Sequence, residues 1–497
     1  MSKGTGSSGL GSLWSGALTA TSMLLVAGVA AVIGVVIARE FGSTDETDGF
    51  LAAYGMFAVI VIAAQAIRLT VLPQLARARQ EQRLAGELAG FSLALGVFAV
   101  PLLLATLVGA DQLATVLTGS GPELAQDTAG EALVWMGPAA VAHLFAALAA
   151  SGLAALDDYA TAAAGYAVGS AAGLALILLR VEPDGIIAVG WGMALNGTIA
   201  MVVALAGLAY KAARTRMPAA AVRPSGAPLR TRLGIFAVGS ALPLAQQLLY
   251  VVCLPFAGRL GTGEPTSFVY AYLGGAALVT ITAGSLGIVT SAPLARLGLD
   301  AADTARHVVA TSWLAIAVAG AAAGIFALAG GDLVEGALGG AFGGEVGAEL
   351  GRLVVAMSPW IIASIGIAVT FPLAFVAART RGLPWIALAA LALQVPLAWA
   401  GAELLGLDGL ALSMGMTTLA ILGALLWELG AFGETMRRLA VAAVVVGGLV
   451  VLAFLPPSLV LGSAASALVG TLLYVGALVV LRPRGLVSGW RYLRALT

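Results

Sequence analysis

Apolar segments recur along almost the whole chain, and short polar stretches separate them. A helix needs about 20 consecutive apolar residues to cross the hydrocarbon core of a bilayer, and segments of this length are found throughout. The pattern predicts fourteen membrane-spanning helices. They cover residues 17–38, 49–71, 88–109, 132–155, 161–179, 186–209, 234–257, 267–291, 308–329, 353–377, 384–403, 409–428, 438–456 and 462–481.

Composition supports an all-α polytopic membrane protein. The chain has 497 residues, of which 60% are hydrophobic and 10% are charged. Soluble globular proteins carry about 25% charged residues. The 65 glycines fit close helix packing in lipid, where small residues let two backbones approach. The first apolar run is too long for the h-region of a signal peptide, so we predict a retained first span.

Landmarks along the chain indicate an internal repeat. Three short patterns recur in the same order and at nearly the same spacing, which predicts two homologous halves. The paired landmarks are Gly42 with Gly261, Pro73 with Pro293, and Pro138 with Pro359. Internal repeats are typical of transporters, which move one half against the other around a site near the bilayer midplane.

The spans and the repeat predict four parts of the chain. An N-terminal lobe of six spans covers 1–210, and a basic cytoplasmic linker covers 211–233. A C-terminal lobe with spans seven to twelve covers 234–430, and a C-terminal helix pair with a tail covers 431–497. Most of the 25 Lys and Arg residues lie on the side of the two termini, so the positive-inside rule places both termini in the cytoplasm.

Several motifs along the chain resemble segments of one family and occur in the same order as in that family. They are AREFGSTDETDGF at 38–50, AVGWGMALNG at 188–197, SFVYAY at 267–272, GSLGIVTSAPLAR at 284–296, AFVAARTRGLP at 374–384 and GLDGLALSMG at 406–415. The chain resembles the MviN/MurJ family of lipid II flippases, within the superfamily that includes multidrug antiporters and polysaccharide flippases. The likeness covers most of the chain through the twelfth span.

The resemblance implies two six-helix lobes around a central cavity and a groove for a lipid tail at the last two helices. It implies transport of a lipid-linked cell-wall precursor, a lipid II-like polyprenyl diphosphate sugar, by alternating access in the bacterial inner membrane. The partners are then the lipid-linked sugar and the bilayer. The sequence leaves open whether an ion gradient or the membrane potential drives transport, and which oligomeric state forms.

The sequence departs from the family at the positions that should bind phosphate. Ala27 and Ile33 stand where the family's first span has arginines, and Gly274 and Ala277 replace an arginine and a glutamate of its eighth span. Arginine suits phosphate because its planar guanidinium bonds two oxygens at once. Two alternatives therefore stay open: a polysaccharide or other lipid-linked oligosaccharide flippase with a less anionic cargo, and a transport-incompetent membrane scaffold. Drug antiport is disfavoured because no carboxylate lies in the middle of a predicted span.

Polar residues within or beside the spans are the candidate cavity residues, because such groups are enriched at functional sites in membranes. Arg68 either contacts phosphate or reaches the headgroups, and Gln65 shares its helix face. Arg39 and Asp48 bracket the first external loop, where the family match makes Asp48 a candidate gating contact and a plain surface pair is the alternative.

Three further candidates are neutral polar residues. His143 lies in the middle of the fourth span, where it either couples transport to protons or sits neutral and hydrogen-bonded between helices. Asn196 and Gln247 are candidates on the same grounds, as is Gln394 for an interhelical hydrogen bond. Of the adjacent Gln246 and Gln247, at most one faces a substrate.

The remaining chemistry of the chain is sparse. Two histidines and one cysteine, Cys253, are too few for an ordinary zinc site, and no phosphate-binding glycine motif occurs. We find no paired nucleophile and base, so the sequence predicts no enzyme activity, no metal and no cofactor. The net charge is zero, which gives no indication of a nucleic-acid partner.

Overall fold

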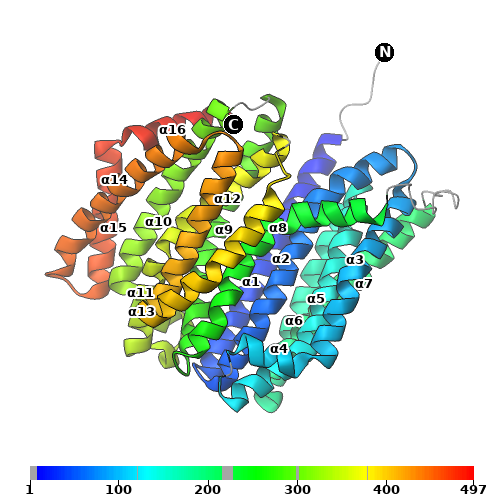
Figure 1. Cartoon of the computed structure of the whole chain (residues 1–497), viewed down its shortest axis with the longest axis horizontal. Coiled ribbons are helices and arrows are strands. Elements are labelled where there is room, and N and C mark those ends of the chain that lie inside the picture. Colours follow the sequence, from blue (N-terminus) through cyan, green and yellow to red (C-terminus); the bar gives the residue numbers. More distant parts are fainter. Residues whose placement is uncertain (1–7, 120, 215–227, 298–300, 378, 497) are drawn as a thin grey trace. The chain divides into compact units, whose positions relative to one another are not determined.

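The computed structural model describes residues 8–119, 121–214, 228–297, 301–377 and 379–496 (Figure 1). Across these residues the backbone forms helices joined by turns, with no strand, so the predicted all-α class is confirmed. The helices are α1 (Ser8–Phe41), α2 (Asp45–Gln80), α3 (Leu84–Val108), α4 (Ala110–Leu117), α5 (Glu123–Ala155), α6 (Tyr159–Asp184), α7 (Ile187–Arg214), α8 (Leu229–Gly258), α9 (Glu264–Leu297), α10 (Ala301–Leu338), the 3-10 helix η2 (Gly340–Phe342), α11 (Gly344–Ala356), α12 (Ser358–Val376), α13 (Leu383–Glu428), α14 (Phe432–Ser458), α15 (Ser463–Leu481) and α16 (Arg484–Leu496).

The predicted spans fall on these helices, except that the span 353–377 crosses the break between α11 and α12 at Met357. Eleven helices within the described residues are long and apolar enough to cross a membrane. One of them, α13, has 46 residues and breaks at Gly406, whose backbone is not helical (φ 60°, ψ −136°). A helix of this length is far longer than a bilayer is thick, so α13 supplies two of the predicted spans. The predicted spans 17–38 and 267–291 lie on α1 and α9, whose side chains are only partly described.

The chain divides into two compact units. The first comprises Met1–Phe41 and Asp45–Gln247, and the second comprises Gly42–Thr44 and Leu248–Thr497. The division therefore falls inside α8. The helices also extend into the predicted linker, because α7 continues to Arg214 and α8 begins at Leu229. The four domain boundaries drawn from the sequence stay a prediction.

In the first unit the alanine-rich helix α5 is the central element. Almost every residue of its second half is buried, and it packs against α2, α3 and α7. The small side chains allow this close approach: a Cβ added at Gly137 would lie 1.9 Å from the Thr106 hydroxyl on α3. Leu75, Phe91 and Leu148 belong to the apolar core that α2, α3 and α5 share.

In the second unit α10 has the central place. The C-terminal pair α14 and α15 packs on it, and its glycines make room for large side chains. A Cβ added at Gly324 would lie 2.5 Å from the Phe454 ring on α14. The Tyr474 hydroxyl of α15 donates a hydrogen bond to the Ala317 carbonyl of α10, at 2.8 Å. These contacts fix the helix pair that lies outside the repeat.

The order and length of the helices follow the predicted repeat. α2 begins at Asp45 and α9 at Glu264, while α5 spans 123–155 and the pair α11–α12 spans 344–376. The offsets between these helices match those of the sequence landmarks. The two halves differ at one point. The counterpart of α5 is interrupted at Met357, whereas α5 itself continues through Pro138, the residue paired with Pro359.

The C-terminal tail contains a helix of its own, which the hydropathy pattern does not predict. It is helical from Arg484 to Leu496 and packs on α10. The sequence gives little sign of this helix, because it is too short and too polar for a membrane span. Its stability comes from contacts with a helix much earlier in the chain, which no local pattern reports.

Candidate functional site

His143 lies in an aromatic cluster inside the first unit. Its ring meets the edge of Phe57 on α2, with the centroids 5.8 Å apart, and stacks with Tyr166 on α6 at 6.3 Å. Tyr54 continues the cluster along α2. No hydrogen bond joins His143 to another described residue. Its contacts with other helices are made by aromatic rings, whereas one of the two predicted alternatives is a hydrogen bond between helices. Among the described residues, no carboxylate pairs with this imidazole.

Asn196 lies beside this cluster on α7. Its neighbour Gly197 packs against α5, because a Cβ added there would lie 3.2 Å from the His143 Cδ2 atom. A Cβ added at Gly169 on α6 would lie 2.8 Å from the Asn196 Oδ1 atom. That oxygen is buried and has no hydrogen-bond partner among the described residues. Two of the predicted site residues, His143 and Asn196, thus lie on adjacent helices of one packed cluster.

Asp48 is buried, unlike a residue of an exposed surface ion pair. It lies in the first turn of α2 together with Asp45 and Glu46, where the helix dipole stabilises negative charge, and it is buried. The adjacent Gly49 packs so closely on α5 that an added Cβ would meet the Ala125 carbonyl at 2.1 Å. Arg39 is exposed in the last turn of α1.

The other predicted residues are spread over α2 and α8. Gln247 is buried in α8, whereas Gln246 beside it is only half-buried. Arg68 and Gln65 belong to α2, but their side chains lie outside the described residues. The predicted role of each of these residues in a cavity therefore stays a prediction.

A second aromatic cluster lies in the second unit, and the sequence pattern does not predict it. Tyr250 of α8 stacks on Tyr272 of α9 with ring centroids 4.2 Å apart, and Tyr272 meets Trp360 of α12 at 4.9 Å. Phe268 also stacks with Tyr250, with the ring centroids 6.2 Å apart. The SFVYAY motif supplies two of these rings. Their partners come from distant helices, so only the fold brings them together.

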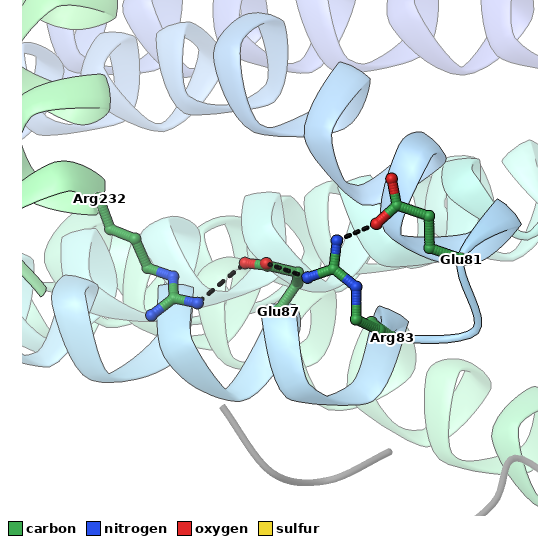
Figure 2. A network of polar contacts seen from close by, with 4 residues as sticks. All are labelled: Glu81, Arg83, Glu87 and Arg232. Carbon is green, nitrogen blue, oxygen red and sulfur yellow. Dashed lines mark hydrogen bonds and ion pairs between the residues drawn. The ribbon is translucent and has the colours of Figure 1, made fainter. Parts of the chain in front are cut away.

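A buried ion pair ties the start of α8 to α3 (Figure 2). The Arg232 guanidinium donates to a Glu87 carboxylate oxygen at 2.9 Å and lies over the Phe91 ring at 5.6 Å. Arg83 contacts the other Glu87 oxygen at 3.6 Å and also pairs with Glu81. We predict Arg232 as a linker residue from the sequence; the structure places it in α8 with its charge buried.

Within the described ranges no group of three His, Cys, Asp or Glu side chains is placed to hold a metal ion. Cys253 is buried and accepts a hydrogen bond from the Gln394 amide, which also donates to Ser413. Gln394 therefore makes the interhelical hydrogen bond that we predict for it.

The helical architecture defines the class of the protein: a polytopic membrane protein with two compact helical units. No protein-family model matches the sequence, and no curated protein matches it. Solved structures do match the fold.

A structure of the lipid II flippase MurJ in an inward closed conformation matches 94% of this chain and 99% of its own, with a TM-score of 0.71 and 14% identity. An inward-facing multidrug resistance MATE family transporter of the MOP superfamily covers 83% of this chain and 98% of its own, with a TM-score of 0.56 and 16% identity. A MOP superfamily transporter from Pyrococcus furiosus covers 86% of this chain and 95% of its own, with a TM-score of 0.56 and 14% identity. The chain therefore has the fold that MurJ shares with MOP superfamily transporters.

Proposed function

We propose that the chain is a membrane flippase that moves a lipid-linked sugar across the bilayer by alternating access. The observation that carries the proposal is the match to the lipid II flippase MurJ over 94% of this chain. A match of this extent reaches into the C-terminal helix pair, which the repeat does not include. A multi-pass protein of this kind would lie in the bacterial inner membrane with both termini in the cytoplasm, and it would not be an enzyme.

The cargo we favour is a polyprenyl diphosphate sugar like lipid II. Arg68, Gln65, Asp48, Arg39, Gln247, His143 and Asn196 would be the polar residues that serve its passage. Of these, Arg68 is the residue best suited to the diphosphate, because a guanidinium binds phosphate oxygens bidentately. The imidazole of His143 and the amide of Asn196 would contact neutral sugar groups rather than phosphate.

One observation favours a less anionic cargo as the alternative. Gly274, at a position where the resembled family has a charged residue, lies against the apolar Val354 side chain, and Ala277 is exposed. Neither can replace the missing charge. The transporter from Pyrococcus furiosus is described as having a binding pocket of reverse polarity that suggests a different function. One fold can therefore serve cargos of different charge, and a lipid-linked oligosaccharide with a single phosphate fits the alternative.

A flipping assay with two cargos tests the proposal. The purified protein is reconstituted in liposomes that contain a fluorescent polyprenyl disaccharide, linked through a diphosphate in one set and a monophosphate in the other. A membrane-impermeant reductant then bleaches every labelled lipid that reaches the outer leaflet. We expect the diphosphate cargo to bleach completely and empty liposomes to retain half of the signal. Movement of the monophosphate cargo alone selects the alternative, and movement of neither overturns the proposal.

Variants separate transport from scaffolding. We expect Arg68→Ala to slow flipping of the diphosphate cargo at least tenfold, since a charge-assisted pair with phosphate is lost. Arg68→Lys should restore part of the rate, because it keeps the charge without the bidentate fork. Arg77→Ala is the matched control, an exposed arginine further along the same helix. Equal rates for R68A and R77A would remove Arg68 from the mechanism.

A further inference from the structure

The last helix of the chain begins where a membrane span ends. α15 closes at Arg482, which has a left-handed backbone (φ 45°, ψ 62°), and Pro483 separates it from α16. A span ends at the boundary between hydrocarbon and headgroups, so the first turn of α16 starts within a few residues of the membrane surface. Figure 1 shows α16 at the same end of the second unit as the start of α14 and the end of α15.

One face of α16 packs on protein. A Cβ added at Gly485 would lie 2.1 Å from the Trp313 indole, and one at Gly489 would lie 2.7 Å from the Ala310 carbonyl oxygen, both on α10. Tyr492, which shares this face, packs its ring on the same helix. Glycines one helical turn apart allow the two backbones to approach. This face is therefore fully used by contacts within the unit.

An apolar strip runs beside the packed face. Helix positions advance by about 100° per residue, which places Val487 opposite Gly485 and Gly489 and places Leu486 and Trp490 on the flank between them. Leu486 and Val487 are half-buried, while Trp490 is 63% exposed. Tryptophan is enriched at the interface between bilayer and water, where its ring is partly in hydrocarbon and its N–H is hydrated.

The edge between these two faces is basic. Arg484, Ser488 and Arg491 follow one another along it, and all three are exposed. Neither arginine has an acidic partner among the residues that the structure describes. The surrounding sequence is equally one-sided, because no Asp or Glu follows Glu434. The arginines after that point are Arg437, Arg438, Arg482, Arg484, Arg491 and Arg494.

We propose that α16 lies in the interfacial layer of the bilayer and binds anionic phospholipid headgroups. Its packed face holds it to α10, its apolar face with Trp490 enters the boundary of the acyl chains, and Arg484 and Arg491 contact lipid phosphates. An amphipathic helix with an aromatic anchor and an arginine-rich polar side has the chemistry of such sites. Each arginine near an anionic surface strengthens the association about fivefold.

The depth of α16 tests the first half of the proposal. Cys253 is the single cysteine and is buried, so a Cys253→Ala background accepts one new label. A fluorophore is attached at Trp490→Cys in full-length protein in nanodiscs, and a matched label at Gln80→Cys marks the exposed end of α2. Lipids that carry a spin label near the top of the acyl chain should quench the fluorophore at position 490 at least threefold more than the fluorophore at position 80. Equal quenching at the two sites overturns the proposal, as does shielding of 490 from lipid and water alike, which would indicate a protein partner.

Lipid selectivity tests the second half. The preference of the protein for spin-labelled phosphatidylglycerol over phosphatidylcholine is measured by electron paramagnetic resonance. We expect the double variant R484Q/R491Q to lose at least fivefold of this preference. The control R381Q/R437Q removes two other exposed arginines of the same unit and should retain most of it. Equal losses would assign the preference to net charge and overturn the role of α16. The test needs no transport assay, so its failure is distinct from that of the proposed function.

Discussion

Ser43 and Gly263 meet although they lie in different halves of the sequence. The Ser43 hydroxyl donates a hydrogen bond to the Gly263 carbonyl at 3.3 Å, across a separation of 220 residues. The separation equals the offset of the internal repeat, so the loop after α1 touches the equivalent loop after α8. Both residues belong to the second unit. The contact therefore joins two equivalent loops within the second unit.

Gly263→Ala should weaken this contact and destabilise the protein. Gly263 has a positive φ of 84°, and an added Cβ would lie 2.3 Å from the Ser43 Oγ atom. Backbone strain of this kind costs about 1–3 kcal/mol, and the displaced hydroxyl adds to it. Thermal unfolding of the purified protein, followed by far-UV circular dichroism, measures the change.

Two further variants separate strain from contact. Gly344→Ala shares a positive φ of 60° but meets no atom within 4 Å, so it should cost less than Gly263→Ala. The double variant S43G/G263A removes the hydroxyl and should recover part of the stability. If Gly263→Ala and Gly344→Ala lower the unfolding midpoint equally, the Ser43 contact contributes nothing.

The spans could be predicted from the sequence because each is a local property. An apolar run of sufficient length has no other stable form in a bilayer. Glu403 and Asp408 bracket the break of α13 at Gly406. The partner of Gln394 could be foreseen only in kind: an amide inside a span needs a hydrogen bond, but the sequence does not say that Ser413 and Cys253 provide it.

The rest depends on contacts between distant segments. Arg232 has the local sequence of a linker, and its burial follows from Glu87, far away on α3. The rings that enclose His143 come from α2 and α6, and no spacing in the sequence pairs them. Hydropathy reports how a segment meets lipid. It does not report which polar or aromatic side chains the packed helices bring together.

Glu87→Ala should destabilise the first unit because it leaves the Arg232 charge buried. Loss of one member of a buried pair costs about 3–5 kcal/mol, whereas removal of both members is often close to neutral. The double variant E87L/R232M should therefore unfold closer to the wild type than E87A does. Chemical denaturation in detergent measures the three free energies of unfolding.

An exposed pair in the same network supplies the control. Glu81 and Arg83 are both about half exposed, so Glu81→Gln should cost less than about 1 kcal/mol. Comparable losses for E81Q and E87A would mean that the Arg232–Glu87 pair is no more important than a surface pair.

Asp158 should make stability depend on pH in the acid range. Burial alone would raise the pKa of its carboxyl, but the backbone N–H and hydroxyl of Thr161 and the Lys211 ammonium outweigh that effect and lower the pKa below its usual 3.8. Because the pKa of Asp158 is lower in the folded than in the unfolded protein, its carboxylate stabilises the folded state at pH values above the unfolded-state pKa. This stabilisation is lost as the pH falls below about 4 and through the pKa of the folded state.

The comparison of wild type with two variants isolates this carboxylate. As the N-cap of α6, Asp158 accepts from the Thr161 N–H at 3.1 Å, so Asp158→Ala should cost about 1 kcal/mol at pH 7. The deficit should shrink between pH 4 and pH 2. Asp158→Asn keeps the capping oxygen and does not titrate, so it should lose less at pH 7. A deficit of D158A that is constant from pH 7 to pH 2 would contradict the assignment.

Gly406→Ala should destabilise the fold of α13 strongly. The φ of 60° and ψ of −136° at this position belong to a region that only glycine adopts readily, with a cost of about 1–3 kcal/mol for other residues. The turn is also tight, because a Cβ added at Gly401 would lie 2.4 Å from the Gly409 carbonyl oxygen. Gly448→Ala is the matched control. Gly448 lies on the exposed face of α14, and a Cβ added there would meet no atom within 4 Å. Alanine is more stable than glycine inside a helix by about 0.5–1 kcal/mol. We expect opposite shifts of the thermal midpoint, down for G406A and level or up for G448A. Equal midpoints would show that α13 can pass from one span to the next without a glycine turn.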